Sequence, residues 1–229
     1  AGLRVISSTV YASNTEFDYN SIGIALNNSL GWMSVISVVL NTGDGISVTN
    51  STLNLADSLV WLNGGIGVHI DPSSVTVASS QITENTAGGV VASGGSAVTV
   101  TQGAVSTNGQ VGVKATGGVL RASNVSISSN NGRGVWLDGG ANATLNAVAV
   151  DANAGPNGFG IVGNGATLSL ANSSLRGNAA GGMVLTTTTG FVTNTQVLTN
   201  TGNGIQIAGG VFNLVDSWVQ FNTAHAVEL

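Results

Sequence analysis

A chain of 229 residues with 34 Gly, 7% charged and 5% aromatic residues lacks the Lys, Glu and Arg that cover ordinary helices, which indicates an all-β protein. Five Lys and Arg against ten Asp and Glu give a net charge of -5, too little positive charge to follow a phosphate backbone, so nucleic acid is not an expected partner. The chain has no cysteine, which excludes disulfides, thiolate metal sites and thiol redox chemistry. Its longest apolar stretch, residues 32–40, is too short and too polar to span a bilayer, so we expect no membrane insertion.

Asparagine recurs at a regular interval along the whole chain. Ten asparagines are spaced about 22 residues apart: Asn20, Asn41, Asn63, Asn85, Asn108, Asn130, Asn153, Asn178, Asn200 and Asn222. About four residues after most of them stands a Gly followed by an apolar residue. A period near 22 with strand-like content predicts a solenoid, in which each unit buries its apolar face by stacking on its neighbours. We therefore expect one elongated domain over residues 1–229, built of about ten coils.

Each coil is expected to contain three short strands. The first follows the Gly, where the residues one and three positions later are apolar, as at Ile46 and Val48. The second carries an inward pair ten and eight residues before the next ladder Asn, as at Leu53 and Leu55, and the third lies three residues before it, as at Val60. Alternation of this kind is typical of a strand with one buried face.

Turn residues separate these strands. A polar residue marks a tight corner between the second and third strands in most coils: Asn14, Asp57, Ser79, Gln102, Asn124, Asn172, Asn194 and Asp216. Three extra residues fall within residues 154–159, which include Pro156 and the pair Asn157-Gly158. We expect this insertion to bulge outward as a loop.

The Gly-apolar-x-apolar strand, the polar corner and the turn Asn together resemble the right-handed parallel β-helix superfamily, the pectate-lyase-like fold, along the whole chain. The resemblance implies a solenoid with three strands per coil and an inward Asn ladder. Each ladder amide is expected to donate to and accept from the turns of neighbouring coils, so the ten asparagines are structural rather than a ligand site.

The resemblance also implies that a functional groove would follow the outer face of the first strand of each coil. Polygalacturonase-like members of the superfamily carry an Asn-Thr-Asp run, an Asp-Asp pair, a Gly-His-Gly and an Arg-Ile-Lys, and pectate-lyase-like members carry several acids for calcium. None of these sets is present, so no catalytic residue is assigned. The densest polar cluster on this face is a candidate carbohydrate contact: His69, Lys114, Arg133, Trp136 and Asp138.

Metal binding is not expected. The two histidines, His69 and His225, lie seven coils apart, and the Gly-Gly pairs lack the Asp spacing of calcium-binding nonapeptide repeats. No cofactor is expected either.

Two classes of function remain. The first is a non-catalytic structural or adhesive β-solenoid, extracellular or at the cell surface, in a stalk, a surface layer or a fibre. The alternative is a polysaccharide lyase, hydrolase or epimerase with its site on the outer face of the first strand. Since residues 1–5 and 225–229 occupy the same strand of the coil with no cap, we expect either flanking domains of a longer chain or end-to-end self-association. A polysaccharide is a further expected partner.

Overall fold

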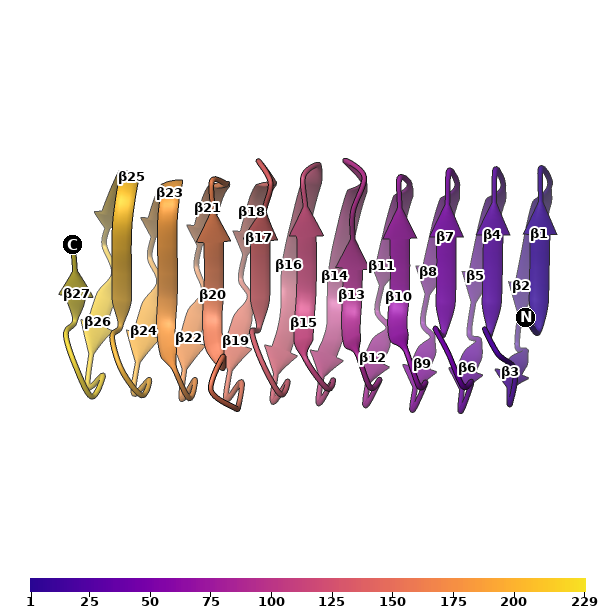
Figure 1. Cartoon of the computed structure of the whole chain (residues 1–229), viewed down its shortest axis with the longest axis horizontal. Helices are drawn as coiled ribbons and strands as arrows, with labels where there is room; N and C mark the ends of the chain where they lie inside the picture. The colour runs from indigo at the N-terminus through magenta and orange to yellow at the C-terminus, as the bar shows by residue number, and fades with distance from the viewer.

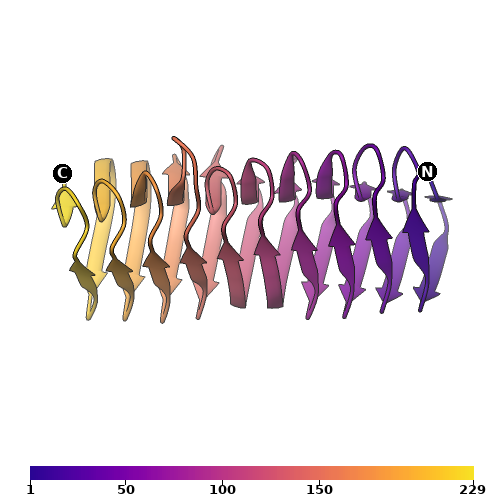
Figure 2. The same cartoon turned by 90° about the horizontal axis from the view of Figure 1, so that it is seen from below.

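The computed structural model describes all 229 residues as a parallel β-solenoid of about ten coils without any helix. Figure 1 shows the coils side by side along one straight axis, with the two termini at opposite ends. Seen from below, in Figure 2, the coils keep the same outline from one end to the other. The solenoid predicted from the 22-residue period is confirmed, and most coils have the three predicted strands.

Three parallel sheets run along the axis, and the first faces the viewer in Figure 1. The first sheet contains β1 (Leu3–Ile6), β4 (Ile24–Asn27), β7 (Ile46–Thr49), β10 (Ile66–Asp71), β13 (Gly88–Ala92), β15 (Val111–Thr116), β17 (Val135–Asp138), β20 (Phe159–Asn164) and β27 (Val227–Glu228).

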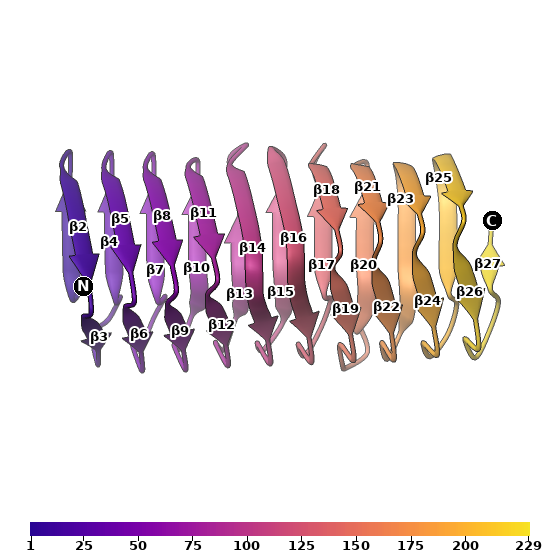
Figure 3. The same ribbon diagram turned by 180° about the vertical axis from the view of Figure 1, so that it is seen from behind.

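The second sheet faces the viewer in Figure 3. It contains β2 (Thr9–Ser13), β5 (Leu30–Ser34), β8 (Thr52–Ala56), β11 (Ser74–Ala78), β18 (Asn142–Asn146) and β21 (Thr167–Ala171). The short strands of the third sheet are β3 (Glu16–Asp18), β6 (Ser37–Val39), β9 (Leu59–Trp61), β12 (Gln81–Thr83), β19 (Ala149–Asp151), β22 (Ser174–Arg176), β24 (Gln196–Leu198) and β26 (Trp218–Gln220).

Four longer strands continue through a corner and belong to two sheets. The strands β14 (Ala97–Ser106) and β16 (Val119–Ser128) join the second sheet to the third, whereas β23 (Gly181–Thr193) and β25 (Ile205–Val215) join the first to the second. The coils that contain these strands therefore have two continuous strands in place of three short ones.

The core lies between the three sheets and consists of stacked rows of aliphatic side chains. Val60, Ile82 and Val105 follow one another on the third sheet, and all three are buried. Forty-five buried apolar residues form one continuous cluster that runs through the described coils. Because each coil contributes the same few inward positions, apolar burial depends on stacking, as expected of a repeat solenoid.

The polar corner residues adopt the left-handed backbone conformation. At all eight predicted corner positions φ lies between 44° and 54°, a region that Asn and Asp tolerate better than most residues. Val35 and Ala147 occupy the same corner in the two coils without a polar residue, with φ of 54° and 53°. A β-branched side chain is strained there, so the corner geometry is imposed by the stack rather than by the local sequence.

The asparagine ladder is confirmed, and Asn108 shows its bonding. The Asn108 Nδ2 group donates to the backbone oxygen of Ile82 at 3.1 Å and to Oδ1 of Asn130 at 3.0 Å. Its Oδ1 accepts from both the backbone N–H and the Nδ2 group of Asn85, each at 3.1 Å. The side chain is fully buried, so each ladder amide satisfies turn groups in the coils on either side of it.

A shorter ladder of serines, which the sequence analysis did not identify, holds the turns between the first and second sheets. The backbone N–H of Ser29 donates to Oγ of Ser51 at 3.0 Å, and Ser51 donates in the same way to Ser73 at 3.0 Å. The hydroxyl of Ser51 also donates to the backbone oxygen of Thr49 at 2.6 Å. In this turn the serine hydroxyl thus has the role that the Asn side-chain amide has in the asparagine ladder.

The insertion lies where it was predicted. Residues 152–158 form a loop between β19 and β20 that is wider than the neighbouring turns at the lower edge of Figure 1. Ala154 donates to the backbone oxygen of Asn130 at 2.7 Å, and Gly158 accepts from Ala180 at 3.0 Å. Pro156 and Asn157 between these anchors are exposed, so the tip of the loop packs on little of the solenoid.

Candidate functional site

The outward residues of the first sheet form one unbroken row. The strand pairing aligns them in this order: Arg4, Ala25, Ser47, His69, Val91, Lys114, Trp136, Val162, Val184, Gln206 and Glu228. Neighbours in such a row are about 4.8 Å apart. Lys114 and Trp136 are therefore adjacent, and His69 lies two strands, or about 10 Å, from Lys114.

Two cations lie over the indole ring of Trp136. The Lys114 Nζ atom is 3.9 Å from the ring centroid, and the Arg133 Cζ atom is 4.2 Å from it. Lys114 comes from β15, whereas Arg133 comes from the turn that leads into β17. Cation–π contacts at these distances contribute about 0.5–1 kcal/mol at exposed sites. The indole thus holds two positive charges in place, and because these cations cover its ring, the ring is not available for stacking against a sugar.

These two positive charges form no salt bridge. The one salt bridge of the described structure joins His69 to Asp44. Nε of Arg133 and Nε1 of Trp136 are buried donors without a hydrogen-bond partner. Because these two atoms are shielded from solvent, a ligand would meet the ammonium of Lys114 and the outer nitrogens of the Arg133 guanidinium instead.

His69 belongs to a hydrogen-bonded pair that the sequence analysis missed. Its Nδ1 atom is 2.9 Å from Oδ2 of Asp44, which precedes the Gly of the preceding coil. The other carboxylate oxygen, Oδ1, accepts from the backbone N–H of Ile66 at 2.8 Å. A carboxylate on Nδ1 fixes the ring orientation and leaves Nε2 as the outward nitrogen. His69 is thus linked to Asp44 rather than to Lys114 or Trp136.

Pairing favours the charged form of both groups, since it raises the pKa of His69 and lowers the pKa of Asp44. The hydrogen bond from His69 to Asp44 raises the pKa of the imidazole above 6.5, against the opposing effect of burial. Burial disfavours ionisation of Asp44, but the hydrogen bonds from His69 and Ile66 outweigh it and lower the carboxyl pKa below 3.8.

The pH range in which the pair stabilises the fold follows from these two directions. The His69 contribution is complete below pH 6.5 and is lost as pH rises through the raised pKa of the folded state. The Asp44 contribution is complete above pH 3.8 and is lost as pH falls through the lowered pKa. The pair therefore stabilises the fold most between these two values.

Acidic side chains lie at the far end of the first-sheet strands. Asp138 is two residues beyond Trp136, and its Oδ1 accepts from the backbone N–H of Gly139 at 2.9 Å. Asp71, two residues beyond His69, accepts from the hydroxyl of Ser93 at 2.9 Å. Of the predicted contact residues, the structure thus brings Lys114, Arg133 and Trp136 together. It leaves His69 two strands away and gives Asp138 a turn-capping hydrogen bond.

A small polar cavity adjoins the cationic cluster. It has a volume of about 300 Å³ and is lined by Gln110, Asn131, Gly132, Arg133, Pro156 and Asn157. The insertion loop forms one wall of this cavity and the turn before β17 forms another. The extra residues of the loop therefore enclose the approach to Arg133.

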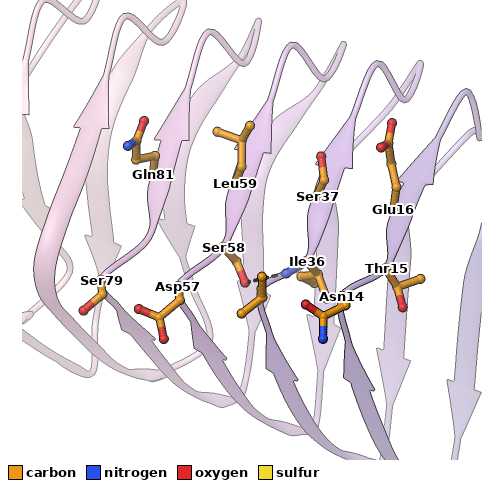
Figure 4. Close-up of a pocket in the computed structure, with 11 residues that line it drawn as sticks. Asn14, Thr15, Glu16, Ile36, Ser37, Asp57, Ser58, Leu59, Ser79 and Gln81 are labelled. Atoms are coloured by element: carbon orange, nitrogen blue, oxygen red, sulfur yellow. Dashed lines mark hydrogen bonds between the residues drawn. The ribbon is translucent and has the colours of Figure 1, made fainter.

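The largest surface cavity lies elsewhere, in the corner between the second and third sheets (Figure 4). Its volume is about 580 Å³, and eight of its eleven lining residues are polar, among them Glu16 and Asp57. The same corner is hollowed again at Asn172 and Asn194, several coils away. Because the hollow recurs with the left-handed corner, it reflects the sharp turn of the coil rather than a specific constellation of side chains. No three His, Asp or Glu side chains of the described structure gather as a metal site.

Comparison with known proteins identifies the family. The family model for the right-handed β-helix region matches residues 1–119 and 115–229, which together cover the whole chain. The chain belongs to the right-handed β-helix family. A search of curated protein sequences finds no match.

Three solved structures resemble this β-helix. A mutant of the periplasmic alginate epimerase AlgG aligns with a TM-score of 0.68 and 12% identity over 97% of this chain and 61% of that chain. The enzymatically active domain of bacteriophage CBA120 tailspike protein 2 aligns with a TM-score of 0.61 and 13% identity over 87% and 39% of the two chains. Pectate lyase Pel9A aligns with a TM-score of 0.50 and 15% identity over 93% and 62%. At these identities the similarity shows the fold alone.

The β-helix spans 61%, 39% and 62% of the lengths of these three proteins. The structure has no helix of the length and apolar character needed to cross a membrane.

Proposed function

We propose that this β-helix is an extracellular, non-catalytic binding module for an acidic polysaccharide, with the contact on the outer face of the first sheet. The observation that carries the proposal is the pair of cations without a salt bridge, Lys114 and Arg133, held over the ring of Trp136. The chain is acidic overall, with a net charge of -5. Two of its five Lys and Arg residues nevertheless converge at this one point.

The geometry of the solenoid suits a polymeric anion. Lys114 and Arg133 belong to consecutive coils, and the coil spacing of about 4.8 Å is close to the length of one sugar residue in an extended chain. A polyuronate carries one carboxylate per sugar, so consecutive carboxylates can meet consecutive coils. The fold neighbours act on glycans of this class, since one is an alginate epimerase and another a pectate lyase.

Affinity electrophoresis in gels that contain alginate or polygalacturonate tests the proposal. We expect the protein to be retarded by these polymers and the retardation to fall with added salt. The double variant Lys114→Ala/Arg133→Ala should bind at least about tenfold more weakly, because a charge-assisted hydrogen bond contributes about 1.5–3 kcal/mol. The matched control is Arg121→Ala/Arg176→Ala, which removes the same charge from the second and third sheets. Equal retardation of the two double variants would contradict the proposal.

A second candidate function, a polysaccharide-active enzyme, is favoured by the His69–Asp44 pair. A half-buried imidazole oriented by a carboxylate is suited to proton transfer, and it lies on the same face as the cations. Incubation with alginate and polygalacturonate would then yield unsaturated ends, new reducing ends or inverted uronates, and His69→Ala would abolish them. Retardation without any such product supports the binding module instead.

End-to-end association of the solenoid, or its continuation by flanking domains, stays a prediction. Light scattering across a concentration series checks the first: growth of rods in multiples of one unit length supports axial stacking, and a constant mass at all concentrations contradicts it.

A further inference from the structure

An aromatic stack stands on the outer face of the second sheet, away from the proposed polysaccharide contact. Tyr11 of β2 pairs with Trp32 of β5, which in turn pairs with Asn54 of β8. The two ring centroids are 5.1 Å apart and the ring planes differ by 12°. Tyr11 is 76% exposed and Trp32 is 39% exposed. Figure 3 shows these three strands next to one another at the N-terminal end of the sheet.

A trough runs beside this stack. Two residues further along the same strands stand the small residues Ser13, Ser34 and Ala56, which are paired with one another across the sheet. The difference in size between the two outward rows leaves a cavity of about 420 Å³, with the aromatic rings and Asn54 on one side and the small residues on the other.

The lining contains no charged side chain. It comprises Tyr11, Ala12, Ser13, Trp32, Met33, Ser34, Asn54 and Ala56. The nearest cation on the same outward row is Arg121, four strands from Trp32 and therefore about 19 Å away. An acidic ligand would find no counter-charge in the trough, in contrast to the first sheet.

We propose that the trough beside Tyr11 and Trp32 is a binding site for a neutral saccharide. The C–H face of a pyranose ring packs against aromatic side chains, and its hydroxyls exchange hydrogen bonds with short polar groups such as those of Ser13, Ser34 and Asn54. Apolar walls with a few polar groups are typical of small-ligand sites. The spacing of the coils allows successive sugars of one chain to lie along successive strands.

This site is independent of the proposed function. It lies on another sheet, it uses other residues, and it selects a neutral ligand rather than an acidic one. Stacking of Tyr11 on Trp32 as a cross-strand pair also stabilises the sheet, so the test must separate binding from folding.

The test is a two-dimensional ¹H–¹⁵N titration that follows the four tryptophan indole signals, with cellohexaose, xylohexaose, mannohexaose and maltohexaose as probes. The Trp32 signal is assigned with the variant Trp32→Phe. We expect at least one hexaose to shift the Trp32 signal in a saturable way while the Trp136 signal stays unchanged. We expect Tyr11→Ala to weaken that binding about tenfold.

Two further variants keep the result interpretable. Asn54→Ala removes a hydrogen-bonding group without touching the aromatic stack and should also weaken binding. Phe191→Ala removes an exposed aromatic at the other end of the same outward row and should leave binding unchanged. No shift of Trp32 with any of the four hexaoses would overturn the proposal. So would binding by folded Tyr11→Ala and Asn54→Ala that is as strong as binding by the unchanged protein, or an equally strong Trp32 shift with an alginate hexamer.

Discussion

Replacement of Asn108 by alanine should destabilise the solenoid more than almost any change on its surface. The variant loses four hydrogen bonds of the buried amide, which join it to Asn85, Ile82 and Asn130. Asn130 Oδ1 still accepts from the Asn108 backbone N–H. The backbone N–H of Asn85 and the carbonyl of Ile82 are the groups that lose a buried partner.

The expected size follows from those two groups. Leaving one buried polar group unpaired costs about 1–3 kcal/mol, so the variant should lose about 2–6 kcal/mol. For a chain of this length, 1 kcal/mol corresponds to about 2–4 °C in Tm. We therefore expect Tm to fall by at least about 4 °C. The control Gln206→Ala alters an outward side chain of the first sheet that makes no hydrogen bond, and surface changes of this kind stay within about 0.5 kcal/mol.

Differential scanning calorimetry of the two variants measures the difference directly. Equal melting temperatures for Asn108→Ala and Gln206→Ala would show that the ladder does not stabilise the stack, and the reasoning from unpaired turn groups would fail.

Four further predictions concern single features of the stack. NMR titration of His69 should give a pKa above 6.5, and Asp44→Asn should bring it back toward that ordinary value; an unchanged pKa would remove the pair from the account. His69→Asn should lower the free energy of unfolding between about pH 4 and 6.5 by about 0.2–1 kcal/mol, as expected for a half-exposed ion pair, and an equally large loss at pH 9 would show that the charge of the imidazole contributes nothing. Deletion of residues 155–157 should change Tm by less than about 2 °C, because the backbone anchors of the loop lie outside them, and a collapse of folding would show an unrecognised contact. Val35→Asn should raise Tm by about 2–4 °C, since it relieves about 1 kcal/mol of left-handed strain, and no gain relative to Val91→Asn would contradict strain at that corner.

The coil could be predicted because equivalent positions, 22 residues apart, have the same burial and the same hydrogen-bond partners. An inward position such as Val60 or Asn108 must match the coils above and below it, so its residue type recurs. Once that period is known, the adjacency of Lys114 and Trp136 follows from counting, and the strand pairing confirms it.

Side chains that reach out of turns could not be predicted in the same way. Asp44 lies in the turn before the Gly of its coil, and its hydrogen bond to His69 joins residues 25 positions apart. Because the residue types in these turns do not recur every 22 residues, the repeat gave no signal for this pair. The serine ladder through Ser51 was hidden by the abundance of serine in the chain. The outward stack of Tyr11 and Trp32 was missed because packing does not constrain the outer face of the second sheet.

An indole titration with a hexamer of mannuronate or galacturonate tests whether the cations over Trp136 bind an acidic glycan. We expect the Trp136 indole signal to shift in a saturable and salt-sensitive way, and Lys114→Ala/Arg133→Ala to abolish that shift while Arg121→Ala/Arg176→Ala preserves it. A Trp136 signal that does not move with either hexamer, or one that moves equally in both double variants, would contradict the claim.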